Sequence, residues 1–488
     1  ELMFPDVDRR EPETLTREHF AIEMAAHGGS VVEIVRRDGV WQPVVDSRYN
    51  RRITADTTPM QVTGPAAGHA RLRTSADPTG TVVAGTLNNC AGGITPWGTY
   101  LMAEENFHGY FAGNLPRNHA EAANHRRYGL PGGWFPWARE FPRFSIRQEP
   151  NEPNRFGWVV EVDPKDPTST PKKRTAMGRL KHEGAESVVA PNGRVVFYMG
   201  DDQIFEYVYK FVTNRALDPH DESANADLLD DGVLYVAKFE DSGTVRWLPL
   251  IHGEGPLTPE NGFASQADVL IETRRAADLL GATPMDRPED VEPDAKTGRV
   301  WVMLTNNVKR TNAGVDAANP RAPNYFGHII EIQEPAGDFT ATLSRWEILV
   351  QCGPDSFGVG ATWNPLTSED GWFSSPDNAA LDPSGGLWVA TDGNQHTGAN
   401  DGLWALHTDG TRRGAGKAFF RAPVGAEVCG PRFTADGKTL FLAVQHPGAG
   451  DDASFANPTT RWPDFKQGQP PRPAVLAITR KDGGAIGT

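Results

Sequence analysis

A short unit recurs along the chain and places the strongest constraint on its fold. In each copy a turn containing glycine leads into a run of β-branched and aromatic residues, and the run ends in polar residues. Such a turn and run are typical of a β-hairpin. The copies are Asp77–Gly85, Pro191–Asp201, Asp294–Asn306, Asp382–Asp392 and Ala435–Gln445. Hairpins that repeat with few helical stretches between them predict an all-β fold, specifically a β-propeller.

A second repeated segment indicates neighbouring strands of similar sheets. Arg155–Asp163 matches Tyr325–Gln333, and Gly402–Gly410 and Pro473–Thr479 are looser copies. The spacing of the copies is irregular, so loops must be inserted between the blades. We expect one decorated propeller domain over residues 1–488.

Within this domain the sequence predicts several additions to the blades. Residues 1–74 form an N-terminal extension with the first strands. Residues 108–156 form a long inserted loop region, with shorter insertions at 213–231 and 449–472, all rich in Pro, Arg, Trp and Asn. Helical periodicity over Ser265–Leu280 predicts a short helix there.

Charge and hydropathy exclude several classes of protein. The formal net charge is −15, from 48 basic and 63 acidic residues, which argues against a nucleic-acid groove and against anionic membranes as partners. No window of 18 apolar residues is present, so we expect no membrane insertion. Glu1–Phe20 lacks the apolar core of a signal peptide, so an exported protein would have lost its signal before residue 1.

Four carboxylates recur with the turns. Counting back nine or ten residues from the turn glycines reaches Glu183, Glu289, Asp377 and Glu427. Equivalent points on the blades of a propeller face one end of the central channel. Carboxylates that converge there repel one another unless cations lie between them, which indicates a hard-cation site. The alternative is that each acid caps a turn or pairs with an arginine.

The segment Thr86–Glu105 contains the most informative cysteine. Cys90 follows a strand and opens a Gly-Gly loop, and the next strand delivers Glu104 and Glu105. Adjacent strand residues face opposite ways, so both acids bind metals only at a strand end or bulge, or between two sites. A thiolate beside carboxylates suits a transition metal next to calcium. Two alternatives are a small buried apolar Cys90 and a nucleophilic Cys90 with His182 as its base.

The other two cysteines leave their pairing open. Three cysteines cannot all form intramolecular disulfides. Cys352 and Cys429 each precede a glycine in similar contexts, and they either pair with each other or remain buried thiols.

Several long motifs resemble the PhoX family of bacterial alkaline phosphatases. They are Asn89–Thr99 with Glu104 and Glu105, Phe156–Pro164, Gly178–Ala185, Arg287–Asp290, Ser375–Asn378 and Gln445–Gly448. The resemblance covers roughly residues 75–480. It implies a six-bladed propeller that is periplasmic or secreted and that is exported by the twin-arginine route.

The resemblance also implies hydrolysis of phosphate monoesters, with Fe3+ and Ca2+ as cofactors and a metal-bound oxo or hydroxide group as nucleophile. Cys90 would bind iron, Glu183 and Glu289 would complete the iron and calcium shell, and Glu427 with Glu104 or Glu105 would bind calcium. Arg287 would bind the substrate phosphate, so that Arg287 and Glu289 form the catalytic pair. Asp377 and Asn378 join the metal ligands on the repeat argument instead. We expect a monomer.

Two rival functions follow from the same residues. A calcium-dependent lactonase-type propeller would gather similar acids but has no use for a thiolate. A non-enzymatic binding propeller would hold one structural calcium. No Gly-rich loop with Lys-Ser/Thr and no Gly-x-Ser-x-Gly elbow occurs, so we expect neither a nucleotide cradle nor a covalent serine.

Overall fold

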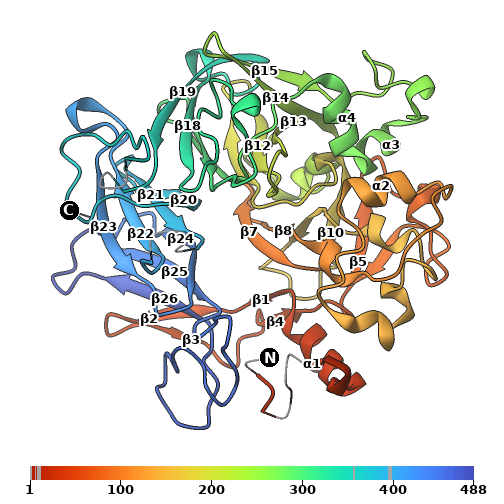
Figure 1. The fold of residues 1–488 in the computed structure, drawn as a ribbon, viewed down its shortest axis with the longest axis horizontal. Helices are drawn as coiled ribbons and strands as arrows, with labels where there is room; N and C mark the ends of the chain where they lie inside the picture. The colour runs from red at the N-terminus through yellow and green to blue at the C-terminus, as the bar shows by residue number, and fades with distance from the viewer. Residues whose placement is uncertain (1–2, 6, 8–11, 355–357, 394–397, 488) are drawn as a thin grey trace.

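The strands of the chain form sheets arranged around a centre, as Figure 1 shows. The computed structural model describes residues 3–5, 7, 12–354, 358–393 and 398–487. Four sheets carry the blades. The first has the order β6-β5-β10-β9-β8-β7 and contains β5 (Pro59–Thr63), β6 (Val82–Ala84), β7 (Asn89–Ile94), β8 (Tyr100–Glu104), β9 (Val159–Val162) and β10 (Lys172–Arg174).

The second sheet joins two blades into nine strands, because β15 pairs with β19. One blade consists of β11 (Glu186–Val189), β12 (Arg194–Gly200), β13 (Val208–Ala216), β14 (Gly232–Glu240) and β15 (Thr244–Pro249). The other consists of β16 (Pro288–Asp294), β17 (Arg299–Leu304), β18 (His328–Gln333) and β19 (Leu343–Gln351).

The last two sheets complete the series. One contains β20 (Pro376–Leu381), β21 (Leu387–Thr391), β22 (Gly402–Leu406) and β23 (Gly416–Arg421). The other contains β24 (Glu427–Phe433), β25 (Thr439–Gln445) and β26 (Ala474–Thr479). The inner strands β7, β11, β16, β20 and β24 contact one another in that order, and β24 returns to β7. This closed ring of inner strands confirms the propeller-like all-β fold.

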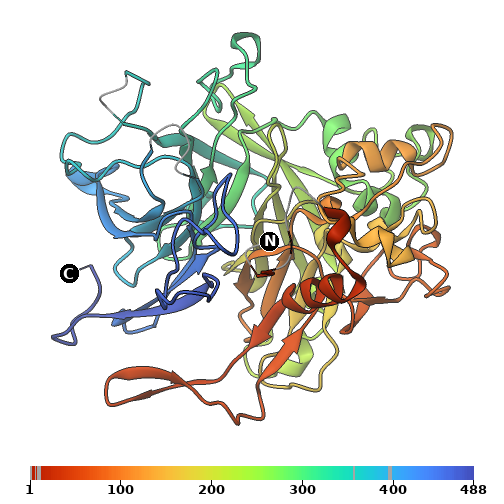
Figure 2. The same cartoon turned by 60° about the horizontal axis from the view of Figure 1, so that its bottom comes forward.

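The expected sixth blade is replaced by two small ribbons. Within the described residues, five blades surround the channel. The ribbon of β1 (Gly29–Val31) with β4 (Arg51–Ile53) and the ribbon of β2 (Ile34–Arg37) with β3 (Val40–Pro43) lie between the last blade and the first (Figures 1 and 2). Trp41 fastens the second ribbon to the last blade, because its indole donates to Thr439 Oγ1 at 3.1 Å and its ring packs on Phe441.

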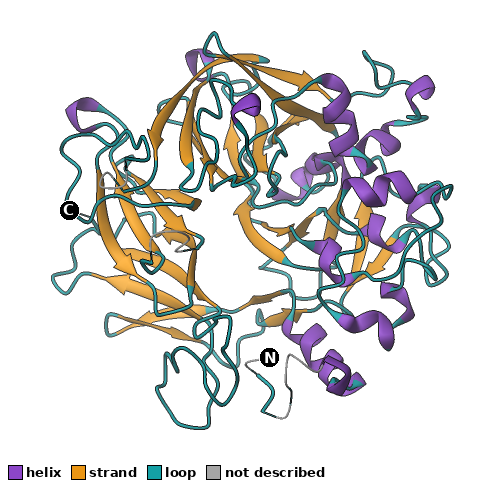
Figure 3. Cartoon of the chain, viewed as in Figure 1, coloured by secondary structure: helices purple, strands orange, loops and turns teal. Residues whose placement is uncertain are grey.

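The helices gather on one side of the ring, over the first two blades (Figure 3). They are α1 (Arg17–Ala26), α2 (Ala122–Arg127), α3 (Gln266–Ile271) and α4 (Thr273–Leu280). The helix expected over 265–280 is therefore present as α3 and α4, with Glu272 between them. The inserted region 108–156 contains α2 and several 3-10 turns. Arg127 of α2 fixes it to the second blade through ion pairs with Glu206 and Asp278.

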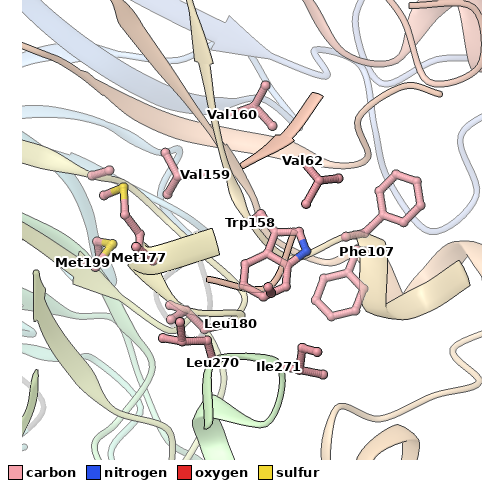
Figure 4. Packing of buried hydrophobic residues seen from close by; sticks show 14 of the residues in the cluster. Val62, Phe107, Trp158, Val159, Val160, Met177, Leu180, Met199, Leu270 and Ile271 are labelled. Atoms are coloured by element: carbon pink, nitrogen blue, oxygen red, sulfur yellow. The ribbon is translucent and has the colours of Figure 1, made fainter. Parts of the chain in front are cut away.

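The hydrophobic core lies between the sheets, where the inward faces of neighbouring blades meet. Figure 4 shows the largest cluster, in which Trp158 of the first blade packs among Phe107, Leu180 and Ile271. Burying each side chain of this size contributes about 1.5–3 kcal/mol. Cys352 is buried in another cluster, and all three cysteines are free thiols, so the disulfide alternative for Cys352 and Cys429 is wrong.

No helix in the described ranges is both long and apolar enough to cross a membrane.

Candidate metal centre

Each of the five inner strands presents one acidic or thiol side chain at the same end of the channel. The residues are Cys90 on β7, Glu183 just before β11, Glu289 on β16, Asp377 on β20 and Glu427 on β24. The four acids are those that recur with the turns of the sequence, and Cys90 takes the fifth equivalent place. The blade repeat thus delivers one potential metal ligand from every blade.

A β-bulge re-aims these side chains in three of the blades. The strand register shifts between Asn89 and Gly92, between Pro288 and Val291, and between Pro376 and Ala379. Each shift encloses one of the ligand candidates, Cys90, Glu289 or Asp377. A bulge releases a residue from the hydrogen-bond ladder and turns its side chain, which explains how neighbouring strand residues escape simple alternation.

The backbone before four of the five ligand candidates has a repeated conformation, which Lys181 before Glu183 does not share. The residue two positions earlier has a positive φ at Asn88 (47°), Arg287 (54°), Ser375 (54°) and Gly425 (74°). Non-glycine residues rarely adopt this left-handed conformation, and such strain persists mainly where surrounding structure enforces it.

The carbonyl of this earlier residue accepts the same hydrogen bond in four blades. Its donors are the N–H groups of Glu105 on Asn88 (3.0 Å), Asp202 on Lys181 (3.0 Å), Thr305 on Arg287 (3.1 Å) and Asp392 on Ser375 (3.2 Å). In the fifth blade the ring of His446 lies 3.0 Å from the carbonyl of Gly425. Each donor lies one or two residues after the second strand of its hairpin, so the blades supply a second ring of polar side chains.

The residues supplied at the inner strands, from Cys90 to Glu427, form a first ring of side chains. Together the two rings bring a thiol and carboxylates close enough to bind one metal ion. The Cys90 thiol donates to Glu183 Oε1 at 2.9 Å. Cys90, Glu105 and Glu183 each offer a ligand atom within 4.8 Å of the others, and so do Glu183, Asp202 and Glu289. Glu183 belongs to both groups, which places it at the centre of a continuous set of ligands.

Arg287 lies within this set. Its guanidinium donates to both oxygens of Asp202 at 2.8 and 2.9 Å and lies 2.9 Å from Glu289 and 3.4 Å from Asp392. Burial by itself raises the pKa of Asp202, but the ion pair with Arg287 outweighs burial and the net pKa is lowered. One arginine balances only part of the surrounding negative charge.

The remaining carboxyls of the cluster are crowded together and have raised pKa values. Burial, then the charge of Asp202, raises the pKa of Glu183 to about 8. Burial and neighbouring carboxylates also hold the pKa values of Glu105, Glu289 and Asp377 well above the usual range. The pKa of the Cys90 thiol is raised well above its ordinary value for the same two reasons. All of these groups can be ionised together only if cations neutralise them.

Glu104 is a correction to the set of ligands expected from the sequence. Its Oε1 accepts from the Lys173 ammonium at 2.6 Å and from Thr86, and its Oε2 accepts from the backbone N–H groups of Gly157 and Trp158. Glu104 and Lys173 are both completely buried inside the first blade. Because the side chain points away from the channel and its oxygens are already bound, only Glu105 faces the candidate metal site.

Removing the charge of Glu104 should therefore destabilise the fold without disabling the site. Glu104→Gln leaves Lys173 buried without its anion, and breaking such a pair costs about 3–5 kcal/mol. Urea unfolding at pH 7 measures this loss, while activity per folded molecule should stay near that of the wild type. Glu105→Gln is the matched variant on the neighbouring residue and should show the reverse pattern. Loss of activity by Glu104→Gln at unchanged stability would return Glu104 to the ligands.

Asn378 also differs from its expected role as a ligand. Its Oδ1 accepts from the Gly430 N–H at 2.9 Å, and its Nδ2 donates to Glu183 at 3.1 Å. Asp290 occupies the equivalent bulge position one blade earlier and accepts from the Ala379 N–H at 3.1 Å. Both side chains therefore tie one blade to the next, and Asn378 in addition orients Glu183.

Four polar residues near the cluster were absent from the sequence-based set. Asp202 and Asp392 contact Arg287, while His446 and Cys429 lie 3.1 Å from Glu427. His182, considered as a base for Cys90, instead has its Nε2 2.9 Å from the Gly178 carbonyl oxygen. The structure thus shows no contact between His182 and the Cys90 thiol, among the residues that it describes.

A β-propeller with carboxylates, a thiol and an arginine at one channel end defines a class of metal-dependent hydrolase. The family model described as alkaline phosphatase PhoX matches residues 2–448. The chain belongs to this family of metal-dependent phosphatases, which act on phosphate monoesters.

Comparison with solved structures agrees with this assignment. Pseudomonas fluorescens PhoX, in complex with the transition state analogue vanadate, has 40% identity and a TM-score of 0.88, with 95% of this chain and 81% of that chain covered. A Xanthomonas campestris gluconolactonase shares 13% identity with a TM-score of 0.30, covering 85% of this chain and 94% of that chain. This second likeness carries no functional weight, and the lactonase alternative is not favoured. A search of curated proteins gives no significant match.

Proposed function

We propose that the enzyme hydrolyses phosphate monoesters at the channel end where the two rings of side chains meet. The proposal is carried by one observation: every blade supplies a carboxylate or thiol at or just before the start of its inner strand, and these groups act electrostatically on one another. The proposed metal ligands are Cys90, Glu105, Glu183, Asp202, Glu289, Asp377 and Glu427. Arg287 binds the substrate phosphate.

The donor set fits iron and calcium together. Carboxylate oxygens are the ligands that Ca2+ prefers, whereas a thiolate suits a softer transition metal. Cys90 lies against Glu183 and within ligand distance of Glu105, so Fe3+ is proposed on the Cys90 side. Ca2+ is proposed among the carboxylates outside the group of Cys90, Glu105 and Glu183, including Glu427. The bound metal ions would supply concentrated positive charge and Lewis-acid activation for phosphoryl transfer.

The residues of the chain prepare the site for an anion. Asp202, Glu289 and Asp392 hold the Arg287 guanidinium at the centre of the cluster. A guanidinium presents paired N–H groups that match two phosphate oxygens, and such pairing stabilises charge as it spreads in the transition state. Arg287 and Glu289 are therefore proposed as the catalytic pair, with Arg287 in contact with the substrate. Thr305 fixes Glu289 by donating to its Oε1 at 2.7 Å.

The Pseudomonas fluorescens enzyme supports this chemistry, because its structure is a complex with vanadate as a transition state analogue. At 40% identity over 95% of this chain, the same reaction is proposed here. Periplasmic or secreted location, twin-arginine export, a monomeric state and a single domain over 1–488 also remain proposals.

Hydrolysis of p-nitrophenyl phosphate tests the function directly. The enzyme loaded with Fe3+ and Ca2+ should release p-nitrophenol at alkaline pH, and a chelator should abolish the release until both metals return. Elemental analysis should find iron as well as calcium. An aliphatic lactone serves as the control substrate and should not be opened. Calcium without iron, or lactone hydrolysis without phosphatase activity, would overturn the proposal.

A further inference from the structure

Lys181 is a buried lysine whose ammonium has no carboxylate partner in the described part of the chain. The residue is 3% exposed. The contact found for its Nζ is His108 Nε2 at 3.4 Å. No carboxylate oxygen of the described residues forms an ion pair with it. Burial and the Arg274 guanidinium oppose the ammonium and lower the pKa of Lys181 to about 8, while the charges of Glu105, Asp201 and Asp202 favour it.

The other deeply buried lysines of these blades each have an anion. Lys173 lies 2.6 Å from Glu104, and Lys210 lies 3.4 Å from Glu334 and donates to the Ala341 carbonyl at 2.7 Å. A buried ammonium without an anion is strongly unfavourable, so a bound anion would stabilise Lys181 in its charged form. Lys181 therefore differs from Lys173 and Lys210, which both have a carboxylate partner.

The carboxylates around Lys181 are occupied by other groups. Arg274 donates to both oxygens of Asp201, Arg287 donates to both oxygens of Asp202, and Asn106 donates to Glu105. These acids therefore supply a negative field but no direct partner. The charge of Lys181 acts on Glu105 and Asp202, as that of Arg287 does, so the ammonium is within reach of an anion bound at this cluster.

The blade repeat makes Lys181 the counterpart of Arg287. Lys181 stands two residues before Glu183, and Arg287 stands two residues before Glu289 on the next blade. The carbonyls of both accept the equivalent backbone hydrogen bond, from Asp202 and from Thr305. The corresponding residues on other blades are Asn88, Ser375 and Gly425, which carry no charge. Two adjacent blades thus place one cation each at the same level of the channel.

The inserted region 108–156 contacts the Lys181 ammonium through His108. His108 at its start packs against the Trp134 ring with 4.8 Å between ring centroids. The backbone N–H of Trp134 donates to the Gly109 carbonyl at 2.7 Å. The Trp134 ring lies so close to Gly109 that a Cβ on this glycine would be only 2.5 Å from it. His108 is therefore confined between Trp134 and the ammonium, which limits how far Lys181 can withdraw from the channel.

We propose that Lys181 is a second phosphate-binding residue, which contacts the phosphoryl oxygens of substrate and product beside Arg287, with His108 as its positioning residue. The inference rests on the proposed function, because it places the phosphate at the same metal centre. An ammonium binds phosphate as a point charge, while Arg287 supplies the directional pair of N–H groups. The two cations together bind the two sides of one anion.

Binding of inorganic phosphate to the metal-loaded enzyme tests the proposal by calorimetry. Lys181→Met should weaken phosphate binding at least tenfold, equivalent to about 1.4 kcal/mol, and should raise KM for p-nitrophenyl phosphate by a similar factor. Lys181→Arg should retain most of the affinity. Lys172→Met is the control, because Lys172 is a partly exposed lysine of the first blade near Asp227. Iron and calcium content should match the wild type in every variant.

A labelling experiment on the wild-type enzyme needs no substitution. Acetic anhydride followed by peptide mass spectrometry should show slower acetylation of Lys181 when inorganic phosphate is present, with no change at Lys172. Unchanged phosphate affinity in Lys181→Met, unchanged acetylation, or loss of iron or calcium by Lys181→Met would each overturn the inference. Loss of metal would identify Lys181 as a counter-charge for the ligands. Absence of ester hydrolysis by the wild type would instead refute the proposed function.

Discussion

Replacing Glu183 by glutamine is expected to lower kcat/KM for p-nitrophenyl phosphate by about a thousandfold, as loss of a central electrostatic group does in other enzymes. Glu183 belongs to both groups of potential metal ligands and accepts hydrogen bonds from Cys90 and Asn378. A glutamine keeps the shape but removes the charge that a cation needs. It also places an N–H donor against neighbours that are themselves donors.

The control for this experiment lies three residues farther along the chain. Glu186 opens β11 three residues later, but it lies 3.4 Å from Arg432 and belongs to neither group of ligand candidates. Glu186→Gln should retain activity and metal content, whereas Glu183→Gln should lose both activity and part of its iron or calcium. Thermal unfolding of both variants separates loss of the site from loss of the fold. Equal activity in the two variants would remove Glu183 from the site.

The first ring of side chains, those at the start of the inner strands, can be predicted from the sequence because a propeller repeats its blades. Each acid stands at or near the start of an inner strand, and the distance from there to the following turn glycine is nearly constant. An offset of nine or ten residues therefore finds Glu183, Glu289, Asp377 and Glu427 without knowledge of the contacts. The repeated backbone geometry gives the offset its physical meaning.

The second ring is harder to find, because its spacing is not constant. Asp202, Thr305, Asp392 and His446 follow the same turn glycines by between six and nine residues. Turn lengths differ, and the register of β12 against β13 shifts between Arg194 and Val196. The signal that remains is a polar residue directly after the second strand of each hairpin. Applied to all blades, that signal finds Asp392 and His446, whereas Asp202 stands one residue farther from its strand, after Asp201.

Alternation along a strand could not decide between Glu104 and Glu105. Both acids stand at the end of β8, and the choice depends on Lys173, which comes from β10 of the same sheet. Only the assembled sheet shows that this lysine lies opposite Glu104. The run Asp77–Gly85 was similarly ambiguous, since it leads into β6 beside β5 at the outer edge, while β7 and β8 form the inner hairpin. The local pattern correctly predicts the strand β6, but its partner β5 ends at Thr63, so the tight hairpin expected at Asp77–Gly85 is wrong.

Removing the metals should make the stability of the enzyme fall steeply as pH rises. In the metal-free protein the pKa of Glu183 is raised to about 8, and those of Glu105, Glu289 and Asp377 are also raised well above the usual range. In the unfolded chain these carboxyls have ordinary pKa values near about 4. Between these limits the folded state binds more protons than the unfolded state.

The sign of the effect follows from proton linkage. Stability changes with pH in proportion to protons bound by the unfolded state minus those bound by the native state, and this difference is negative here. Each carboxyl therefore removes about 1.4 kcal/mol of stability per pH unit inside its window, which for Glu183 runs from about 4 to about 8. Urea unfolding in chelator from pH 5 to pH 8.5 should show this decline. In Glu183→Gln the free energy of unfolding should fall less steeply with pH, because one titrating carboxyl is missing. Restoring Fe3+ and Ca2+ should remove the decline, because cations take the place of the protons. A chelated enzyme equally stable at pH 5 and pH 8 would contradict the buried cluster of acids.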